Sequence, residues 1–448
     1  MSAIELHPLT EPSRTPSLSS KDVLGPENIR DETEPPRDAV DALPRWNYPK
    51  VHMWRTFAAF WSFFVVGMND GSYGLEEYYS LNYTIVSLIF LSPFAGYSLA
   101  AITNNLVHIR LGQRGVAIIG PCCHLISYIV LALHPPYAVL VVMFIFVGFG
   151  NGLIDAAWCA WLANMANANQ IAGFLHCFYA VGATAAPLVA TGLFSRSGVE
   201  WYYYYYILIG TSFIELATST LAFWTQTGAR YCADNPSTQT QTSGRTREAI
   251  KYKLTWIFAL FIFGYMGAEV SLGGWIVVFM TKLRSATSFQ SGATATGFWA
   301  GMAVGRVVLG FVTARLGEFR SVLVYIGISI GLELVFWLVP NLIVSAVAVA
   351  LLGAFLGPLF PTAMVLVTKM MPRHLHVGSV GFAAAIGGSG GAIFPFLVGA
   401  IAQEKGVESL QPVILSILVL ILGLWVSIPW VGKRMRGVES AMEGGRAD

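Results

Sequence analysis

Residues 137–161 read YAVLVVMFIFVGFGNGLIDAAWCAW, and this stretch decides the class of protein to which the chain belongs. Its only charged residue is Asp155, and it is long enough to cross a bilayer, which takes about 20 apolar residues in a helix. Similar runs recur along the 448-residue chain, which is 55% hydrophobic and 12% charged. Soluble domains carry about 25% charged residues. The composition therefore predicts a polytopic α-helical membrane protein.

The apolar runs predict twelve transmembrane helices in two six-helix halves. The expected spans are 54–74, 83–105, 115–134, 137–161, 172–194 and 202–224, then 254–280, 293–314, 321–340, 342–370, 377–402 and 411–432. The halves are thus 54–224 and 254–432, joined by a polar cytoplasmic linker at 225–253. Residues 1–53 are rich in Pro, Ser and acids and lack an apolar signal-peptide core, so we expect a disordered cytoplasmic tail. A short cytoplasmic tail, 433–448, ends the chain.

Lysine and arginine residues predict the orientation of the spans. With both termini on one side, the loops on the opposite side hold only Arg196, Lys282, Arg284 and Lys405. Cytoplasmic loops carry the excess of Lys and Arg in membrane proteins. We therefore expect both termini in the cytoplasm, with the plasma membrane as the location.

An internal repeat relates the two halves. Arg110-Leu111-Gly112 follows the second span and Arg315-Leu316-Gly317 follows the eighth, 315 − 110 = 205 residues later. The fourth span has Gly148-x-x-x-Gly152 and the tenth has Gly353-x-x-x-Gly357, at the same offset of 353 − 148 = 205 residues. Parallel repeats of this kind build one large class of transporters.

Three acidic residues within the spans are the candidates for proton coupling or substrate binding. An ionisable group costs several kcal/mol in hydrocarbon, so it usually faces a cavity or a partner. Asp155 follows Asn151 in the fourth span, Asp70 follows Asn69 near the outer end of the first, and Glu269 lies in the glycine-rich seventh. Each can take up and release protons, although hydrogen bonding to a facing helix, or for Asp70 a cap near the membrane surface, would also account for it.

Arg306 predicts either a cytoplasmic gate or a permanent packing clamp, and the sequence does not separate the two. It lies among small residues just before the turn after the eighth span. The predicted gating set is Gly301, Gly305, Arg306, Gly310 and Arg315. Small residues at this spacing let helices approach closely.

Other polar and aromatic residues of the spans carry weaker indications. Glu215 and Glu333 are isolated in the sequence and we expect structural hydrogen bonds for both. His124 and His176 have no second ligand nearby, which favours packing over metal binding. The aromatic residues expected to line a cavity are Trp158, Tyr179, Trp275 and Trp299.

Motifs for catalysis, metals and nucleotides are absent from the sequence. There is no Walker loop, HExxH, GxSxG or paired-cysteine metal motif, and the five cysteines suggest no disulfide framework. We therefore expect neither an enzyme nor a cofactor, and no nucleic-acid partner.

Several motifs together resemble the fucose-permease-like branch of the major facilitator superfamily. They are Gly-Phe-Gly-Asn-Gly at 148–152, Phe174-Leu175-His176, and Gly182 with Pro187. Tyr265-Met266-Gly267-Ala268-Glu269-Val270, Gly273-Gly274-Trp275 and the segment 301–317 resemble its fungal bypass-of-stop-codon-type members. The resemblance covers 54–432 and implies twelve helices, alternating access, and coupling carboxylates at Asp70 and Asp155.

Two positions depart from the pattern of that family. Cys159 stands where the fourth-helix motif usually has an asparagine. Similar sequences also have a few more residues between Gly74 and Leu75, so the first helix is expected to be short, with Glu76 and Glu77 moved inward.

These observations predict a monomeric secondary transporter in the lipid bilayer that moves a small neutral organic molecule, with protons as the coupling ion. Export of a fungal secondary metabolite is the alternative direction to sugar-type import. From another class, a non-transporting nutrient receptor on a transporter scaffold stays open.

Overall fold

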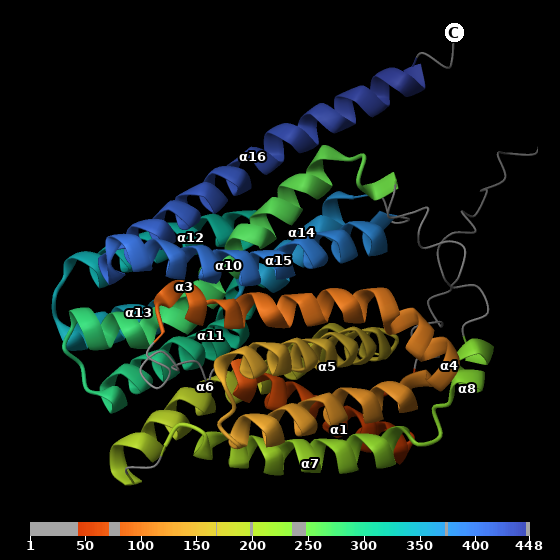
Figure 1. Ribbon diagram of the computed structural model, residues 1–448. Helices are drawn as coiled ribbons and strands as arrows, with labels where there is room; N and C mark the ends of the chain where they lie inside the picture. Colours follow the sequence, from red (N-terminus) through yellow and green to blue (C-terminus); the bar gives the residue numbers. More distant parts are fainter. Residues whose placement is uncertain are drawn as a thin grey trace, which may run out of the picture. The chain divides into compact units, whose positions relative to one another are not determined.

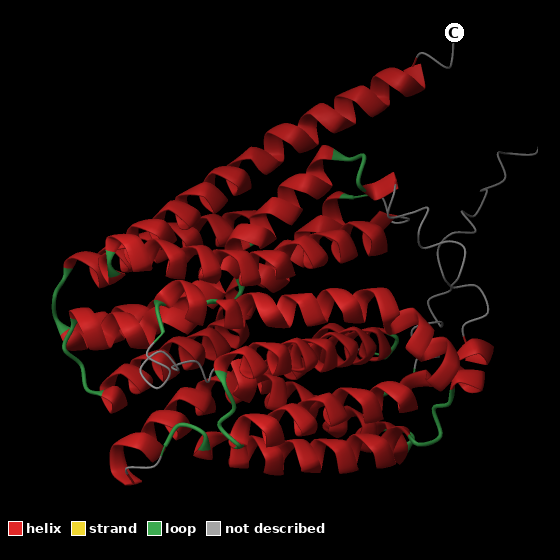
Figure 2. Cartoon of the chain, viewed as in Figure 1, coloured by secondary structure: helices red, strands yellow, loops and turns green. Residues whose placement is uncertain are grey.

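The computed structural model describes residues 44–70, 81–166, 168–197, 200–234, 248–371 and 375–444. The helices of the N-terminal half (Figure 1) are α1 (Lys50–Asp70), α3 (Tyr83–Val86), α4 (Leu88–Ala132), α5 (Tyr137–Ala163), α6 (Ala168–Ser197) and α7 (Tyr203–Phe223). The short α8 (Gly228–Asp234) follows. Helices of the C-terminal half are α10 (Lys253–Leu283), α11 (Ser288–Leu316), α12 (Glu318–Leu338), α13 (Leu342–Leu356), α14 (Leu359–Met370), α15 (His376–Lys405) and α16 (Leu410–Gly444). Figure 2 shows helices joined by short loops, without strands in the described residues.

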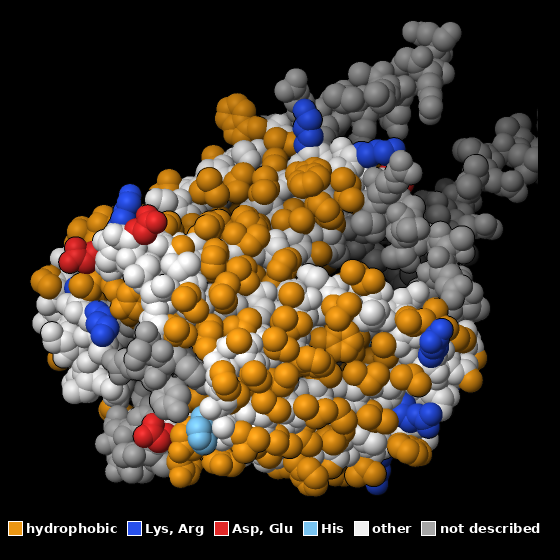
Figure 3. All heavy atoms as spheres, in the orientation of Figure 1, with side chains coloured by type: hydrophobic (Ala, Val, Ile, Leu, Met, Phe, Trp, Pro, Cys, Tyr) orange, Lys and Arg blue, Asp and Glu red, His pale blue; other side chains and the backbone are white. Residues whose placement is uncertain are grey.

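The described helices account for twelve membrane spans, as the sequence predicts. Ten helical stretches are long and apolar enough to cross a membrane, and one of them, Tyr83–Ala132, holds two spans because the chain kinks at Gly112. α1 is the twelfth by its place in the repeat, although it is not among the ten. Figure 3 shows hydrophobic side chains across the middle of one face, with the charged side chains gathered toward its two ends. This distribution suits a helical bundle surrounded by lipid.

Two glycines at corresponding places in the halves both have a positive φ. Gly112 has φ 71° at the kink within α4, and Gly317 has φ 86° between α11 and α12. They lie 317 − 112 = 205 residues apart, and a positive φ is accessible to glycine at little cost. The repeat seen in the sequence therefore includes a positive-φ glycine at the same place in each half.

The repeat also extends to helix packing. A Cβ placed on Gly148 would lie 2.1 Å from the carbonyl oxygen of Pro93, and one on Gly353 would lie 2.2 Å from that of Phe298. Because 298 − 93 equals 353 − 148, α4 with α5 and α11 with α13 are equivalent pairs. The contacts of α6 with α1 (Gly182 on Phe64) and α15 with α10 (Gly390 on Phe263) are similarly close, at 2.1 and 2.0 Å from the carbonyl oxygens.

The halves meet at the end of the bundle where α1 finishes and α4 begins, here called the distal end. The backbone N–H of Tyr83 donates to Oε1 of Gln403 at 2.8 Å. A Cβ on Gly399 would lie 2.8 Å from the Cβ of Ser87, and one on Gly292 would lie 2.8 Å from the Cβ of Thr191. These contacts join α3, α4 and α6 to α15 and α11, so the distal end is closed.

Several boundaries differ from the sequence prediction. The tenth span is divided by Gly357-Pro358 into α13 and α14, because proline cannot donate to the preceding turn. α1 begins at Lys50, the predicted linker contains α8, and α16 runs past the predicted end at 432 to Gly444. The predicted shortening after Gly74 falls in 71–80, and most of the N-terminal tail in 1–43; both lie outside the described residues.

Candidate functional site

The last two residues of α1 form one side of the candidate site. Nδ2 of Asn69 donates to Oδ1 of Asp70 at 3.0 Å. The hydroxyl of Tyr179, in the middle of α6, donates to Oδ2 of the same carboxylate at 3.1 Å. A Cβ placed on Gly67 would lie 2.0 Å from the backbone oxygen of Tyr179, so only glycine lets α1 and α6 approach this closely. This approach brings Asp70 and the Tyr179 hydroxyl together. Asp70 therefore has neutral hydrogen-bond donors as its recorded partners.

An ion pair in the C-terminal half forms the opposite side. Nη2 of Arg306 in α11 lies 3.1 Å from Oε1 of Glu269 in α10, and the two side chains are 18% and 5% exposed. Nε of Arg306 also donates to the backbone oxygen of Gly357 at 3.3 Å. One guanidinium thus ties α11 to α10 and to the α13–α14 junction. Tyr265 lies one turn before Glu269 on α10 and within electrostatic range of Arg306.

Tyr179 joins the two sides. Its ring meets that of Trp299 edge to face, with centroids 6.5 Å apart, and its hydroxyl lies within electrostatic range of Glu269 and Arg306. Asp70, Tyr179, Trp299, Glu269 and Arg306 are called here the central polar cluster. They come from α1, α6, α10 and α11, so both halves contribute to the cluster.

The structure places other predicted site residues elsewhere in the N-terminal half. Oδ1 of Asp155 accepts from the Cys159 thiol at 3.4 Å, one turn along α5. Asn151 is 1% exposed, and its Oδ1 has no recorded hydrogen-bond partner. Trp158 is fully buried and stacks on Phe223 of α7 at 4.3 Å, which places it in the core of this half.

Trp275 belongs to the distal closure. Its ring packs against Tyr83 and Phe90 of the N-terminal half, with centroid distances of 5.8 and 6.2 Å. Its Nε1 donates to the backbone oxygen of Pro395 at 3.1 Å. The side chain therefore lies between the halves at their closed end, and its predicted place in a cavity wall stays a prediction.

The predicted gating residues divide into two groups. Cβ positions on Gly301 and Gly305 would lie 2.0 and 1.9 Å from backbone oxygens of α13, whereas a Cβ on Gly310 would meet open space. Arg315 is exposed at the end of α11. The hydrogen-bond and ion-pair partners of Arg306, Gly357 and Glu269, belong to its own half, which suits a packing clamp; a gating role stays a prediction.

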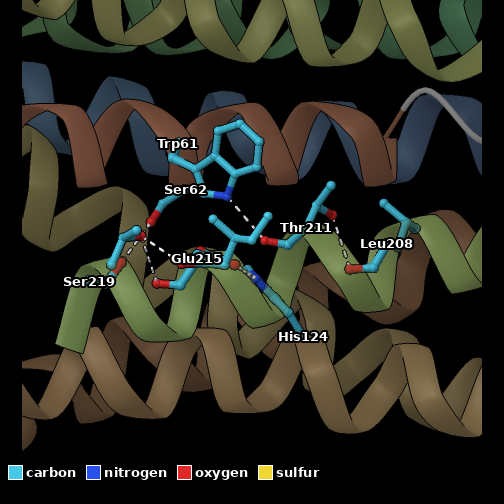
Figure 4. A network of polar contacts seen from close by, with 9 residues as sticks. Trp61, Ser62, His124, Leu208, Thr211, Glu215 and Ser219 are labelled. Carbon is cyan, nitrogen blue, oxygen red and sulfur yellow. Dashed lines mark hydrogen bonds and ion pairs between the residues drawn. The ribbon is translucent and has the colours of Figure 1, made fainter. Parts of the chain in front are cut away.

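A buried histidine–glutamate pair was missed by the sequence analysis. Nδ1 of His124 in α4 lies 2.9 Å from Oε2 of Glu215 in α7, and both side chains are 0% exposed. Figure 4 shows this contact beside two links from α1 to α7, in which Nε1 of Trp61 donates to the Thr211 backbone at 3.0 Å and the Ser62 and Ser219 hydroxyls lie 3.5 Å apart. Neither residue is isolated, and Glu215 has the structural bond that we expected.

Only some of these side-chain contacts could have been predicted from sequence spacing. Tyr265 and Glu269 are four residues apart, a spacing that brings side chains together on a helix. Nothing comparable links His124 to Glu215, which are 91 residues apart. The described residues contain no group of three or more His, Cys, Asp or Glu side chains that could hold a metal ion.

Within the described residues, twelve membrane spans form two repeated halves, and polar groups of both halves meet between them, which is an arrangement typical of a membrane transport protein. The Major Facilitator Superfamily profile matches residues 55–395, and the chain belongs to this superfamily of transporters. It is not an enzyme family, as the absence of catalytic motifs predicted.

Known relatives agree with this membership. The chain is 28% identical over 404 residues to Bypass of stop codon protein 6 of Saccharomyces cerevisiae, covering 82% of this chain and 80% of that protein. It is 23% identical over 379 residues to the glucose/mannose transporter GlcP of Bacillus subtilis, covering 82% and 92%. The fungal resemblance predicted from the sequence is confirmed.

Solved structures show the same fold. The fucose:proton symporter of E. coli matches with a TM-score of 0.60 at 16% identity, covering 84% of this chain and 97% of that one. A D-xylose-proton symporter matches with a TM-score of 0.68 at 14% identity, covering 83% and 97%. At these identities the likeness concerns the fold alone.

Proposed function

We propose that this protein is a proton-coupled secondary transporter for a neutral, hydroxyl-rich solute of the monosaccharide class. The observation that carries the proposal is the central polar cluster, in which a carboxylate of one half and an ion pair of the other meet across Tyr179 and Trp299. Aromatic faces pack against the apolar faces of sugar rings, and the polar groups can hydrogen-bond to hydroxyls.

The charges of the cluster favour a neutral solute. Arg306 is balanced by Glu269 at 3.1 Å, so the cluster offers no unpaired cation to an anionic substrate. Asp70 and Asp155 have neutral partners, namely an amide, a phenol and a thiol. These two carboxyl groups can gain or lose a proton without breaking an ion pair, and we assign proton coupling to them.

The relatives support the same solute class. Two of them are named as a glucose/mannose and a glucose/galactose transporter, and two structural neighbours are proton symporters for fucose and D-xylose. The closed distal end suits one state of an alternating-access cycle. Protonation can bias such a cycle only if the two states bind the proton with different affinity.

The test is uptake of radiolabelled D-glucose, D-mannose or L-fucose into proteoliposomes with an imposed pH gradient. We expect accumulation that a protonophore abolishes. Asp70→Asn and Asp155→Asn should lose accumulation, while Glu318→Gln, which alters a carboxylate paired with Lys369 at the opposite end of the bundle, should not.

Three results would count against the proposal. Solute flux that does not depend on the pH gradient would contradict proton coupling. Unchanged accumulation in both Asp70→Asn and Asp155→Asn would contradict the assignment of proton coupling to these two residues. Saturable binding without any flux would favour the nutrient receptor.

A further inference from the structure

Tyr179 contacts both sides of the central polar cluster, Asp70 in its own half and Trp299 in the other. Its helix, α6, belongs to the N-terminal half and packs directly on α1 through Gly67. Its hydroxyl donates to Oδ2 of Asp70 at 3.1 Å. Its ring meets Trp299 of α11 at 6.5 Å and an interplanar angle of 82°. A change at the hydroxyl can therefore affect the α6–α11 contact between the halves.

The charged and titratable groups around this contact come from four helices, α4, α6, α10 and α11. His124 and Tyr128 of α4 lie within electrostatic range of the Asp70 carboxylate. Tyr97 of α4 and the Glu269–Arg306 pair lie within electrostatic range of Tyr179. Tyr265 of α10 and His176 of α6 lie within electrostatic range of Arg306. Among them, the recorded hydrogen bonds to Asp70 come from Asn69 and Tyr179.

We propose that Tyr179 is a positioning residue that couples the protonation of Asp70 to the contact between the two halves. The inference rests on the proposed function, because it assigns a partner to the proton site named there. A hydroxyl bonded to an ionised carboxylate makes a charge-assisted hydrogen bond, about twice as strong as a neutral one. When Asp70 is protonated this bond weakens, and the hydroxyl is released toward the Glu269–Arg306 pair or a bound solute.

The Tyr179 hydroxyl would then have two alternative hydrogen-bond partners. With Asp70 ionised, Tyr179 is held to α1 within its own half. With Asp70 protonated, the same hydroxyl can bond across the interface to the C-terminal half. Proton binding to Asp70 therefore favours the arrangement in which the Tyr179 hydroxyl bonds to the C-terminal half. Any coupling mechanism requires such a difference between the two arrangements.

The decisive experiment compares Tyr179→Phe with Tyr325→Phe in reconstituted full-length protein. Tyr325 is also buried and hydrogen-bonded, to Leu309 and Thr313, but lies in the C-terminal half away from Asp70. The first readout is the pH-induced infrared difference spectrum, in which the carboxyl band of Asp70 is assigned by its loss in Asp70→Asn. This readout needs no substrate and no flux.

We expect Tyr179→Phe to move the pH midpoint of that band toward higher pH by roughly one unit, which corresponds to about 1.4 kcal/mol, because the ionised carboxylate loses a charge-assisted hydrogen bond. Tyr325→Phe should leave the midpoint unchanged. In the transport assay, Tyr179→Phe should lower proton-driven accumulation about tenfold while solute exchange at equal pH is retained, since about 1.4 kcal/mol corresponds to tenfold.

An unshifted midpoint in Tyr179→Phe, or an equal shift in Tyr325→Phe, would overturn the positioning role. Equal loss of accumulation and exchange would also overturn it, because that pattern indicates a general defect in the transport cycle. If the wild-type protein shows no proton-driven uptake, the proposed function fails, and the infrared measurement still decides whether Tyr179 controls Asp70.

Discussion

The imidazole Nδ1 of His124 lies 2.9 Å from the carboxylate Oε2 of Glu215, and neither side chain is exposed. The pair joins α4 to α7, and α7 in turn is bonded to α1 through Trp61 and through Tyr204, whose hydroxyl donates to the backbone oxygen of Met68 at 2.7 Å. Asp70 lies two residues after Met68. The peripheral pair therefore helps to hold the helix that carries a central residue.

Removing one member of this pair should be costly. His124→Leu leaves the Glu215 carboxyl buried without its partner, and we expect a loss of about 3 kcal/mol in stability. The double variant His124→Leu/Glu215→Leu should lose less than the sum of the single variants. Thermal unfolding of the purified wild type, single variants and double variant in detergent completes this double-mutant cycle. Additive losses of stability would show that the two residues do not interact.

Glycine is required at Gly305 but not at Gly310 of the same helix. A Cβ on Gly305 would lie 1.9 Å from the backbone oxygen of Ala354, whereas one on Gly310 meets no atom within 4 Å. Gly305→Ala should therefore separate α11 from α13 and cost about 1–3 kcal/mol. Gly310→Ala should be neutral or stabilise by up to about 1 kcal/mol through helix propensity. Equal melting temperatures in a thermal-shift assay would contradict the predicted packing.

Arg284, one of the few basic residues in the loops opposite the termini, should contribute to the stability of the fold. Its guanidinium donates to the backbone oxygens of Phe336 and Trp337 and to the Ser345 hydroxyl, at 2.8, 2.9 and 3.1 Å. Arg284→Ala leaves the carbonyl groups at the end of α12 without this donor, and we expect a loss of about 1.5–3 kcal/mol. Lys405→Ala, at the exposed end of α15, is the control and should unfold like the wild type.

A disulfide across the distal closure should stop transport. The Cβ position of Gly292 lies 2.8 Å from the Cβ of Thr191, so small movements bring two cysteines to the usual separation of about 3.8 Å. In a background without the native cysteines, Thr191→Cys/Gly292→Cys should lose uptake on oxidation and regain it on reduction. The single variants should respond to neither treatment. Rapid transport by the cross-linked protein would mean that this end does not open during the cycle.

The candidate site was partly accessible from the sequence. Asp70, Asn69, Glu269 and Arg306 stand out because polar groups within apolar spans need partners. Their partners could not be predicted, since Tyr179 and Asp70 are 109 residues apart and helix rotation decides which side chains meet. Trp158 shows the limit: its apolar surroundings suit a cavity wall or a core equally well, and the structure places it against Phe223.

The sequence by itself determined that the chain crosses the membrane and that its halves repeat. The length of the apolar runs follows from the thickness of the bilayer. The glycines at 112 and 317 follow from the positive φ that the chain adopts there. Only the tertiary structure decided that His124 meets Glu215 and that Tyr179 lies between Asp70 and Trp299. Those contacts depend on the rotation and approach of helices distant in sequence, and packing of the whole bundle sets both.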